Sequence, residues 1–269
     1  MAVKGAHAGK GVIVTGAGGG IGEGIAKLAA VEGARVLVND LGGDAHGDGA
    51  DGACARRVAD EIEAAGGEAV ANGHSIATWA GAQAIVRHAI DAFGRVDAVI
   101  NNAGILRDTE FHEMDPADWD KVRAVNLDGY FYVSRAVAPC FQAQNGGVFV
   151  HMTSTGGLIG NRRQANYMAS KLGVVGLSKS IAIDMERFNV RSNLDFKLSS
   201  IFSAAIDLGA RKEDRMSSGI PADNGGYMNP FFQAVRALPN LPMFTPEGIP
   251  TASRAGAGVV NPIAALDNS

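Results

Sequence analysis

Short apolar segments alternate with segments of helical periodicity through most of the chain. The apolar segments lie at 12–14, 35–38, 69–71, 99–100 and 148–150. Between them, residues 21–31, 53–65 and 82–93 have the spacing of helices with one apolar stripe. This alternation is typical of a parallel sheet with helices on both faces. Right-handed crossovers then predict an α/β fold with a doubly wound parallel sheet.

A glycine-rich turn joins the first strand to the first helix, with the sequence Thr15-Gly16-Ala17-Gly18-Gly19-Gly20-Ile21-Gly22. Glycines in such a turn let main-chain amides approach a pyrophosphate, and the helix N-terminus favours its negative charge. The turn therefore indicates a Rossmann-type, dinucleotide-binding domain. A turn that only reverses the chain direction is the alternative.

Asp40 ends the second strand, 18 residues after Gly22. This is close to the spacing of a carboxylate that accepts hydrogen bonds from the adenosine ribose. A carboxylate there would repel a 2′-phosphate, and the glycine turn contains no lysine or arginine that would attract one. Asp40 therefore favours NAD over NADP as cofactor. The alternative is a solvated turn residue before Gly42 and Gly43.

Tyr167 and Lys171 are four residues apart on a predicted helix, so their side chains share one face. For proton transfer near neutral pH, the pKa of the tyrosine must fall by roughly 3 units, or about 4 kcal/mol. A neighbouring ammonium and a positively charged nicotinamide would each lower this pKa. Ser154 follows the fifth strand, at the sheet edge where parallel sheets bind ligands. A surface Tyr–Lys pair is the alternative.

Charge and composition exclude several other classes. The net charge of −4 gives no reason to expect nucleic acid or an anionic membrane as partner. No apolar run is long enough for a membrane span, and residues 1–10 lack the apolar core of a signal peptide, so we expect a cytoplasmic protein. Cys54 and Cys140 are expected to be reduced thiols. The six histidines show no metal-binding spacing, so no metal site is expected.

Two long helices are expected at 116–144, where Pro116 suits a first helical turn, and at 164–187. The pattern changes near Asn193, because seven of the nine prolines follow it. Closely spaced prolines disfavour long helices and central strands. We therefore expect a dinucleotide-binding and catalytic domain at 1–193 and a divergent, proline-rich C-terminal segment at 194–269.

Taken together, five motifs resemble the short-chain dehydrogenase/reductase family. They are TGAGGGIG at 15–22, NNAG at 101–104, Asn126 within AVNLDG, Ser154 within HMTSTGG, and YMASK at 167–171. They occur in the family's order and spacing. The resemblance covers about seven-tenths of the chain and implies an oxidoreductase with a nicotinamide cofactor.

The resemblance also implies roles for individual residues. Tyr167 would be the general acid/base, and Lys171 would lower its pKa and hold the nicotinamide ribose. Ser154 would hydrogen-bond the substrate oxygen, and Asn126 would position a water in the proton path. Asn101 would mainly support the sheet. The cofactor would be bound by Gly16, Gly20, Ile21, Gly22, Asp40, Asn102, Ala103, Gly104, Tyr167 and Lys171.

A narrower resemblance points to the substrate. The segments VNDLGGD at 38–44, NNAGILRD at 101–108 and QANY at 164–167 resemble the (3R)-hydroxyacyl-CoA dehydrogenase unit of the multifunctional β-oxidation enzyme and its bacterial relatives. This implies a 3-hydroxyacyl thioester as substrate and a dimer or tetramer formed through the two long helices. A steroid or acyl-carrier alcohol as substrate, or a cofactor-binding protein without turnover, are the alternatives. His74 replaces an aspartate that contacts adenine in these relatives.

The resemblance ends abruptly at about Asn193, so 194–269 are expected not to form the family's sixth strand, substrate-covering helix and seventh strand. Genuine divergence explains this ending, with the tail forming an irregular cover. A shifted reading frame or a sequence error explains it slightly better, because the similarity stops at one point instead of fading. A tail that left the sheet uncovered would expose apolar surface and promote self-association.

Overall fold

The computed structural model describes residues 5–185, 189–197 and 203–210. These all belong to a first unit, 1–212, and the second unit, 213–269, lies outside them. The strands are β1 (Gly11–Thr15), β2 (Arg35–Asn39), β3 (Glu68–Asn72), β4 (Ala98–Asn101), β5 (Val148–Met152), β6 (Asn189–Lys197) and β7 (Ser203–Ala210). The helices are α1 (Gly20–Val31), α2 (Ala53–Ala64), α3 (Trp79–Phe93), η1 (Phe111–Glu113), α4 (Pro116–Arg123), η2 (Ala124–Asp128), α5 (Gly129–Gln144), α6 (Gly156–Ile159) and α7 (Ala165–Asp184).

The strands form one sheet in the order β3-β2-β1-β4-β5-β6-β7, in which β1 to β6 are parallel. The strand order reverses between β1 and β4, which confirms the doubly wound, Rossmann-type fold. In such sheets the ligand crevice lies beyond the carboxyl ends of the strands at this reversal. The ends of β1, β2 and β4 carry the glycine turn, Asp40 and Asn102.

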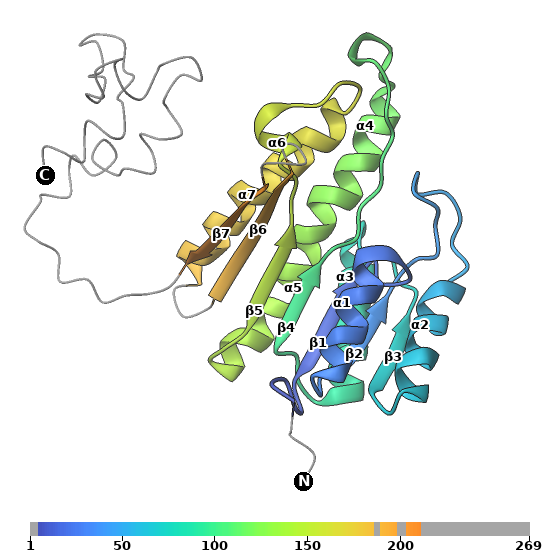
Figure 1. The fold of residues 1–269 in the computed structure, drawn as a ribbon, viewed down its shortest axis with the longest axis vertical. Helices are drawn as coiled ribbons and strands as arrows, with labels where there is room; N and C mark the ends of the chain where they lie inside the picture. The colour runs from blue at the N-terminus through green and yellow to red at the C-terminus, as the bar shows by residue number, and fades with distance from the viewer. Residues whose placement is uncertain (1–4, 186–188, 198–202, 211–269) are drawn as a thin grey trace, which may run out of the picture. The chain divides into compact units, whose positions relative to one another are not determined.

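Helices cover both faces of the sheet, as the alternating pattern predicts (Figure 1). On one face, α3, α5 and α7 pack against a core that includes Ile13, Leu37 and Phe149. On the other face, α1 and α2 pack against Val12 and Val36 with small side chains such as alanine. Alternate residues of β1 therefore point into different cores, as the period of a strand requires.

The predicted long helix at 116–144 is present, but its hydrogen bonding changes in the middle. It begins at Pro116, where Asp115 Oδ1 accepts a capping hydrogen bond from Ala117 N at 2.7 Å. Residues Ala124–Asp128 form a π-helical turn, η2, between α4 and α5. A π turn adds one residue to the helical turn and often marks a functional position. Asn126 lies in this turn and is fully buried.

A sixth strand is present, and its pairing with β5 ends at Asn193, so the prediction that 194–269 do not form the family's sixth strand is not contradicted. β6 pairs in parallel with β5, from Val148 opposite Asn189 to Met152 opposite Asn193, and continues to Lys197. The open edge of β5 offers main-chain donors and acceptors that any extended segment can pair with, whatever its side chains. β7 is antiparallel to β6 and follows after residues 198–202, so it does not reach the sheet by a crossover.

The predicted domain boundary, with a domain at 1–193 and a segment at 194–269, stays a prediction. β6 crosses this boundary, but 198–202 and 211–269 lie outside the described residues, and so do all seven tail prolines. The predicted absence of a substrate-covering helix falls on these residues as well. Across the part of the chain that the structure describes, no helix combines the length and the apolar character needed to cross a bilayer.

Candidate functional site

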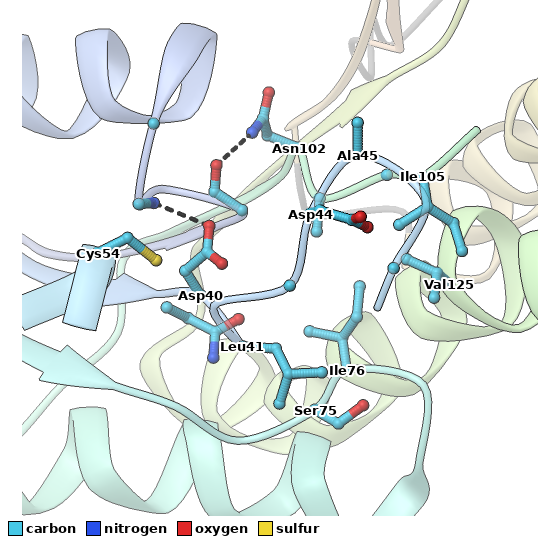
Figure 2. A pocket seen from close by; sticks show the side chains of 18 of the residues that line it. Asp40, Leu41, Asp44, Ala45, Cys54, Ser75, Ile76, Asn102, Ile105 and Val125 are labelled. Carbon is cyan, nitrogen blue, oxygen red and sulfur yellow. Dashed lines mark hydrogen bonds between the residues drawn. The ribbon is translucent and has the colours of Figure 1, made fainter. Parts of the chain in front are cut away.

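A cavity of about 610 Å³ lies at the carboxyl ends of β1, β2 and β4, where the strand order reverses. Figure 2 shows it enclosed by the glycine turn, the chain after Asp40, and the segments around Ser75 and Ile105. Of the predicted cofactor residues, six line it, namely Gly16, Gly20, Asp40, Asn102, Ala103 and Gly104. Further lining residues, which the sequence analysis did not assign, include Gly18, Gly19, Cys54, Ser75, Ile76 and Val125.

The glycine turn brings main chain to the cavity wall at positions where a side chain would not fit. Gly16 has φ +63°, and a Cβ there would lie 2.6 Å from Ala103 Cα. A Cβ at Gly18 would lie 2.9 Å from Asp40 Cγ. Gly22 is packed against the carbonyl of Gly16, and Ile21 is 67% exposed. The structure therefore places Ile21 and Gly22 beside the cavity but not in its wall.

Asp40 is tied to the glycine turn. Its Oδ2 accepts a hydrogen bond from Gly18 N at 2.9 Å (Figure 2). Its Oδ1 accepts one from Gly42 N, also at 2.9 Å. Each carboxylate oxygen can accept a second hydrogen bond, so both can still bind a hydroxyl in the cavity. The bond to Gly42 is the turn contact that the alternative reading of Asp40 describes. The turn contact does not prevent Asp40 from lining the cavity, and its predicted role in binding a ribose stays a prediction.

Asn102 holds the carboxyl ends of β1 and β4 together. Its Nδ2 donates to the carbonyls of Thr15 and Gly16, at 3.1 and 3.0 Å. Thr15 Oγ1 in turn accepts hydrogen bonds from the amides of Asn102 and Ala103. The neighbouring Asn101 is buried in β4 and donates to Ser134 Oγ, which matches its predicted role in supporting the sheet.

Arg57 on α2 lies next to the glycine turn, which the sequence analysis did not foresee. Its Nη2 donates to the carbonyl of Gly18 at 2.9 Å. Glu23 and Glu61 pair with the same guanidinium, at 2.8 and 2.7 Å. Arg57 and then Lys27 lower the pKa of Glu23 to about 2. A cation therefore does lie near the ribose side of the cavity, but two carboxylates neutralise it.

Three of the predicted catalytic residues, Ser154, Tyr167 and Lys171, lie between β5 and α6 and on α7, outside the cavity lining named above. Tyr167 is half-buried in the first turn of α7, and Lys171 is buried one turn later. Thr153 Oγ1 donates to the carbonyl of Lys171 at 2.6 Å, which joins the segment after β5 to α7. Ser154 Oγ accepts a hydrogen bond from Gly156 N at 3.3 Å, so its own proton remains available for another acceptor.

The ammonium of Lys171 is held by groups other than Tyr167. Its Nζ donates to Tyr130 Oη at 3.0 Å and to the carbonyl of Met152 at 2.8 Å. It lies 5.5 Å from the ring centre of Tyr167, and burial lowers the pKa of Lys171 to about 8. The sequence analysis missed Tyr130, since nothing in its local sequence distinguishes it from other helix tyrosines.

The pKa of Tyr167 is shifted in the opposite direction to the one expected. Burial raises it, and the carboxylate of Asp108 raises it further. Burial is the larger cause of this rise, and the lowering of the pKa by Lys171 and a bound nicotinamide stays a prediction. A phenol in this state is protonated at neutral pH and can donate its proton.

Asn126 uses its side chain to hold the main chain of Ile105. Its Oδ1 accepts from Ile105 N at 2.9 Å, and its Nδ2 donates to Ile105 O at 3.0 Å. The paired contacts fix the segment after β4, which forms part of the cavity wall. The side-chain amide is thus engaged, and its role in positioning a water stays a prediction.

A buried histidine lies behind the catalytic residues and was also missed. Ser178 Oγ donates to Val174 O, so it accepts from His151 Nδ1 at 2.7 Å. Ser134 Oγ accepts from Asn101 Nδ2 and donates to His151 Nε2 at 3.1 Å. The hydrogen bonds therefore assign a neutral imidazole with its proton on Nδ1. Burial and the nearby lysine lower the pKa of His151 to about 4. The network ties β5 to α5 and α7.

Known proteins are similar in sequence to this chain over the region that contains the cavity and the predicted catalytic residues. A sequence profile of the short chain dehydrogenase family matches residues 10–194. A short-chain type dehydrogenase/reductase of Mycobacterium tuberculosis is 50% identical over 182 residues, which are 68% of this chain and 64% of that protein. The peroxisomal multifunctional enzyme type 2 of Mus musculus is 45% identical over 185 residues, which are 69% of this chain and 25% of that enzyme. The chain thus spans less than two thirds of these relatives.

Two solved structures have the same fold. A short chain dehydrogenase from Mycobacterium avium is 40% identical with a TM-score of 0.65, over 70% of this chain and 68% of that one. A metagenomic short-chain oxidoreductase in complex with NADP is 32% identical with a TM-score of 0.65, over 71% of this chain and 84% of that one. Neither similarity extends over the whole of this chain.

Proposed function

We propose that this chain, which belongs to the short-chain dehydrogenase family, transfers a hydride between a 3-hydroxyacyl-CoA and NAD. The observation that carries the proposal is the cavity at the reversal of strand order, with Asp40 in its wall, on the same sheet edge as Ser154, Tyr167 and Lys171. The nicotinamide, when bound, supplies the hydride acceptor or donor. The chain supplies orientation and the proton.

The residues present fit a dinucleotide. Main chain from Gly16 to Gly20 faces the cavity at the start of α1, where a pyrophosphate would be bound by amides and the helix dipole. The free acceptor positions of Asp40 suit the two hydroxyls of an adenosine ribose. Asp40 supports NAD, whereas the NADP bound by the metagenomic relative and the nearby Arg57 are the observations in favour of NADP. We favour NAD because Glu23 and Glu61 already neutralise Arg57.

The proton path begins at Tyr167. Its raised pKa keeps the phenol protonated, which suits donation to a ketone oxygen. Alcohol oxidation requires the phenolate, which becomes more populated as pH rises. Ser154 has a free proton with which to hold the substrate oxygen. Lys171, between Tyr130 and Met152, would reach the nicotinamide ribose from its position one turn below Tyr167.

The substrate class rests on the multifunctional enzymes among the relatives and on the 38–44 and 101–108 segments that resemble them. The test compares (3R)- and (3S)-3-hydroxyacyl-CoA as substrates with NAD and with NADP, at alkaline pH. We expect oxidation of the (3R) epimer with NAD and none of the (3S) epimer. Turnover of a steroid alcohol alone would move the assignment to another substrate. NADH binding without turnover of any alcohol would leave a cofactor-binding protein.

We also propose a homo-oligomer formed through α5 and α7. Phe131 on α5 and Leu172 on α7 are each 46% exposed, and Ile183 on α7 is 72% exposed. Exposed large apolar side chains on two neighbouring long helices favour an interface between copies. Light scattering after gel filtration measures this directly. A monomer at micromolar concentration would contradict it.

A further inference from the structure

The loop between β2 and α2 forms one wall of the cofactor cavity. Leu41, Gly43, Asp44, Ala45 and Gly47 all line the cavity. In Figure 2 the chain passes from Asp40 along Asp44 and Ala45 toward Ile105. We refer to 41–52 as the cavity loop. A cofactor that enters this cavity lies directly against it.

Residues 44–48 of the cavity loop form a compact turn held by its own hydrogen bonds. Asp44 Oδ1 accepts hydrogen bonds from the amides of His46 and Asp48, at 2.8 and 3.0 Å, and Asp44 N donates to Asp48 O. Gly47 has φ +80°, and a Cβ there would lie 2.9 Å from Ile105 Cδ1. The turn therefore packs closely on the segment after β4 and presents the carboxylate of Asp48.

Arg107 uses all three of its guanidinium nitrogens, two of them on this turn and one on α4. Nε donates to His46 O at 3.0 Å, and Nη2 donates to both oxygens of Asp48, at 2.8 and 2.9 Å. Nη1 pairs with Asp118 on α4 at 2.8 Å. Lys121 adds a second cation to Asp48, at 2.6 Å. This planar, forked arrangement requires arginine, because a lysine cannot bind three acceptors in these directions.

The same stretch of chain holds the start of α7. Arg107 O accepts a hydrogen bond from Asn166 Nδ2 at 3.0 Å, and Asn166 Oδ1 accepts one from Tyr167 N at 2.7 Å. Asp108 Oδ2 accepts from Gln164 Nε2 at 2.8 Å, and Thr109 N donates to Arg163 O. The side chain of Arg107 thus binds the cavity wall, and its main chain binds the residue that precedes Tyr167.

We propose that Arg107 is a positioning residue that couples the cavity loop to the placement of Tyr167. A cofactor that fills the cavity presses on the loop, and the loop is fastened to Arg107. The position of Arg107 sets the N-terminus of α7. Closing of the loop around a dinucleotide and alignment of the acid/base are therefore one event. The inference rests on the proposed function for the identity of the bound dinucleotide.

Asp48→Asn is the decisive variant, because Asp48 touches Arg107 and Lys121 but no catalytic group. With the ion pairs weakened, we expect the KM for the cofactor to rise roughly fivefold. Because Arg107 couples the cavity loop to Tyr167, we also expect the kcat of this variant to fall roughly threefold at saturating cofactor. Asp51→Asn is the matched control on the same loop, since Asp51 accepts only from Ala53 N and does not line the cavity. It should leave both constants unchanged.

Hydrogen exchange gives a readout that needs no turnover. In the wild-type protein, NADH should increase protection at 41–52 and at 163–170 together. In Asp48→Asn and Arg107→Ala, NADH should still protect the glycine turn but no longer 163–170, and Arg107→Lys should not restore this protection. Unchanged kcat and wild-type protection of 163–170 in Asp48→Asn would overturn the coupling. A wild-type protein that binds NADH but oxidises no alcohol would instead contradict the proposed function and leave the exchange test valid.

Discussion

Around Gly16 and Asp40 the cavity wall is made of main chain and of side chains that bind main chain, whereas the region around Tyr167 contains buried titratable side chains. Asp40 and Asn102 bind four main-chain groups between them, in the glycine turn, in Thr15 and in Gly42. Lys171, by contrast, is buried with a pKa lowered to about 8, and burial raises the pKa of Tyr167. The second region changes its charge near pH 8, where Lys171 loses its proton.

The difference separates binding from chemistry. A cofactor region held largely by contacts to main chain has little to lose when one catalytic side chain is changed. The catalytic region lowers the stability of the folded protein, because it buries the ammonium of Lys171. We therefore expect variants of the two regions to differ in kcat, in cofactor selectivity and in the pH dependence of stability.

The largest effect is expected for Tyr167→Phe, which removes the acid/base and keeps the ring. We expect kcat to fall by about 10³-fold, in the range of general acid/base catalysis. The dissociation constant for NADH, measured by fluorescence, should stay within about twofold. If NADH binding fell in parallel with kcat, the two regions would not be separable, and the comparison would fail.

The next effect concerns stability at the catalytic end. Burial lowers the pKa of Lys171 from 10.5 to about 8, so below pH 8 the folded state carries the full cost of a buried charge. As pH rises from 8 to 10.5 the folded protein loses this proton first, and stability increases relative to a variant without the amine. We therefore compare the free energy of unfolding of Lys171→Met with that of wild type at each pH. The difference in favour of Lys171→Met should be roughly 3 kcal/mol larger at pH 7 than at pH 10.5.

Part of that gain is offset, because Tyr130 Oη and Met152 O lose their donor at every pH. The measurement is urea unfolding of both proteins from pH 7 to pH 10.5. Asp40→Asn is the control from the cofactor end, where no such slope is expected. Parallel curves for wild type and Lys171→Met would show that the ammonium is solvated.

A smaller effect is expected in cofactor choice. Asp40→Asn removes the charge that repels a 2′-phosphate and weakens the ribose contacts, which are worth about 1.5–3 kcal/mol. The ratio of kcat/KM for NAD over NADP should fall by about 10-fold to 100-fold. kcat with NAD should change little, since Asp40 lines the cofactor cavity and lies away from Tyr167. A wild-type protein that prefers NADP would refute the role given to Asp40.

The smallest effect is expected for Glu23→Gln, which removes one of the two carboxylates on Arg57. A partly released guanidinium next to Gly18 should raise kcat/KM for NADP by roughly threefold, as for an exposed ion pair. Combined with Asp40→Asn, the gain should exceed that of either change alone. Glu61→Gln serves as the companion variant, because Glu61 binds the same guanidinium from α2.

Local patterns predicted the elements of the fold and the residues of the site, but not their contacts. The strands β1 to β5, the start of α4 and the cavity residues of the glycine turn follow from periodicity, Pro116 and glycine spacing. Arg57 reaches Gly18 from a different helix, and no local pattern records such a contact. The raised pKa of Tyr167 depends on burial by the whole fold. β6 forms because β5 offers an open edge, which a proline count after Asn193 does not register.

The π turn η2 has a consequence for insertions and deletions. The helix before it, α4, contacts α7, while the helix after it, α5, contacts α3 and turns Val133, Val137 and Phe141 into the core. Because the π turn accommodates one extra residue, removing one residue from 124–128 would restore regular helical hydrogen bonds and leave α4 and α5 close to their present register. Removing one residue from the regular helix α5 would instead rotate the part of α5 that follows by about 100° and turn its apolar stripe away from the sheet. We therefore expect the core to tolerate a deletion in η2 far better than a deletion in α5.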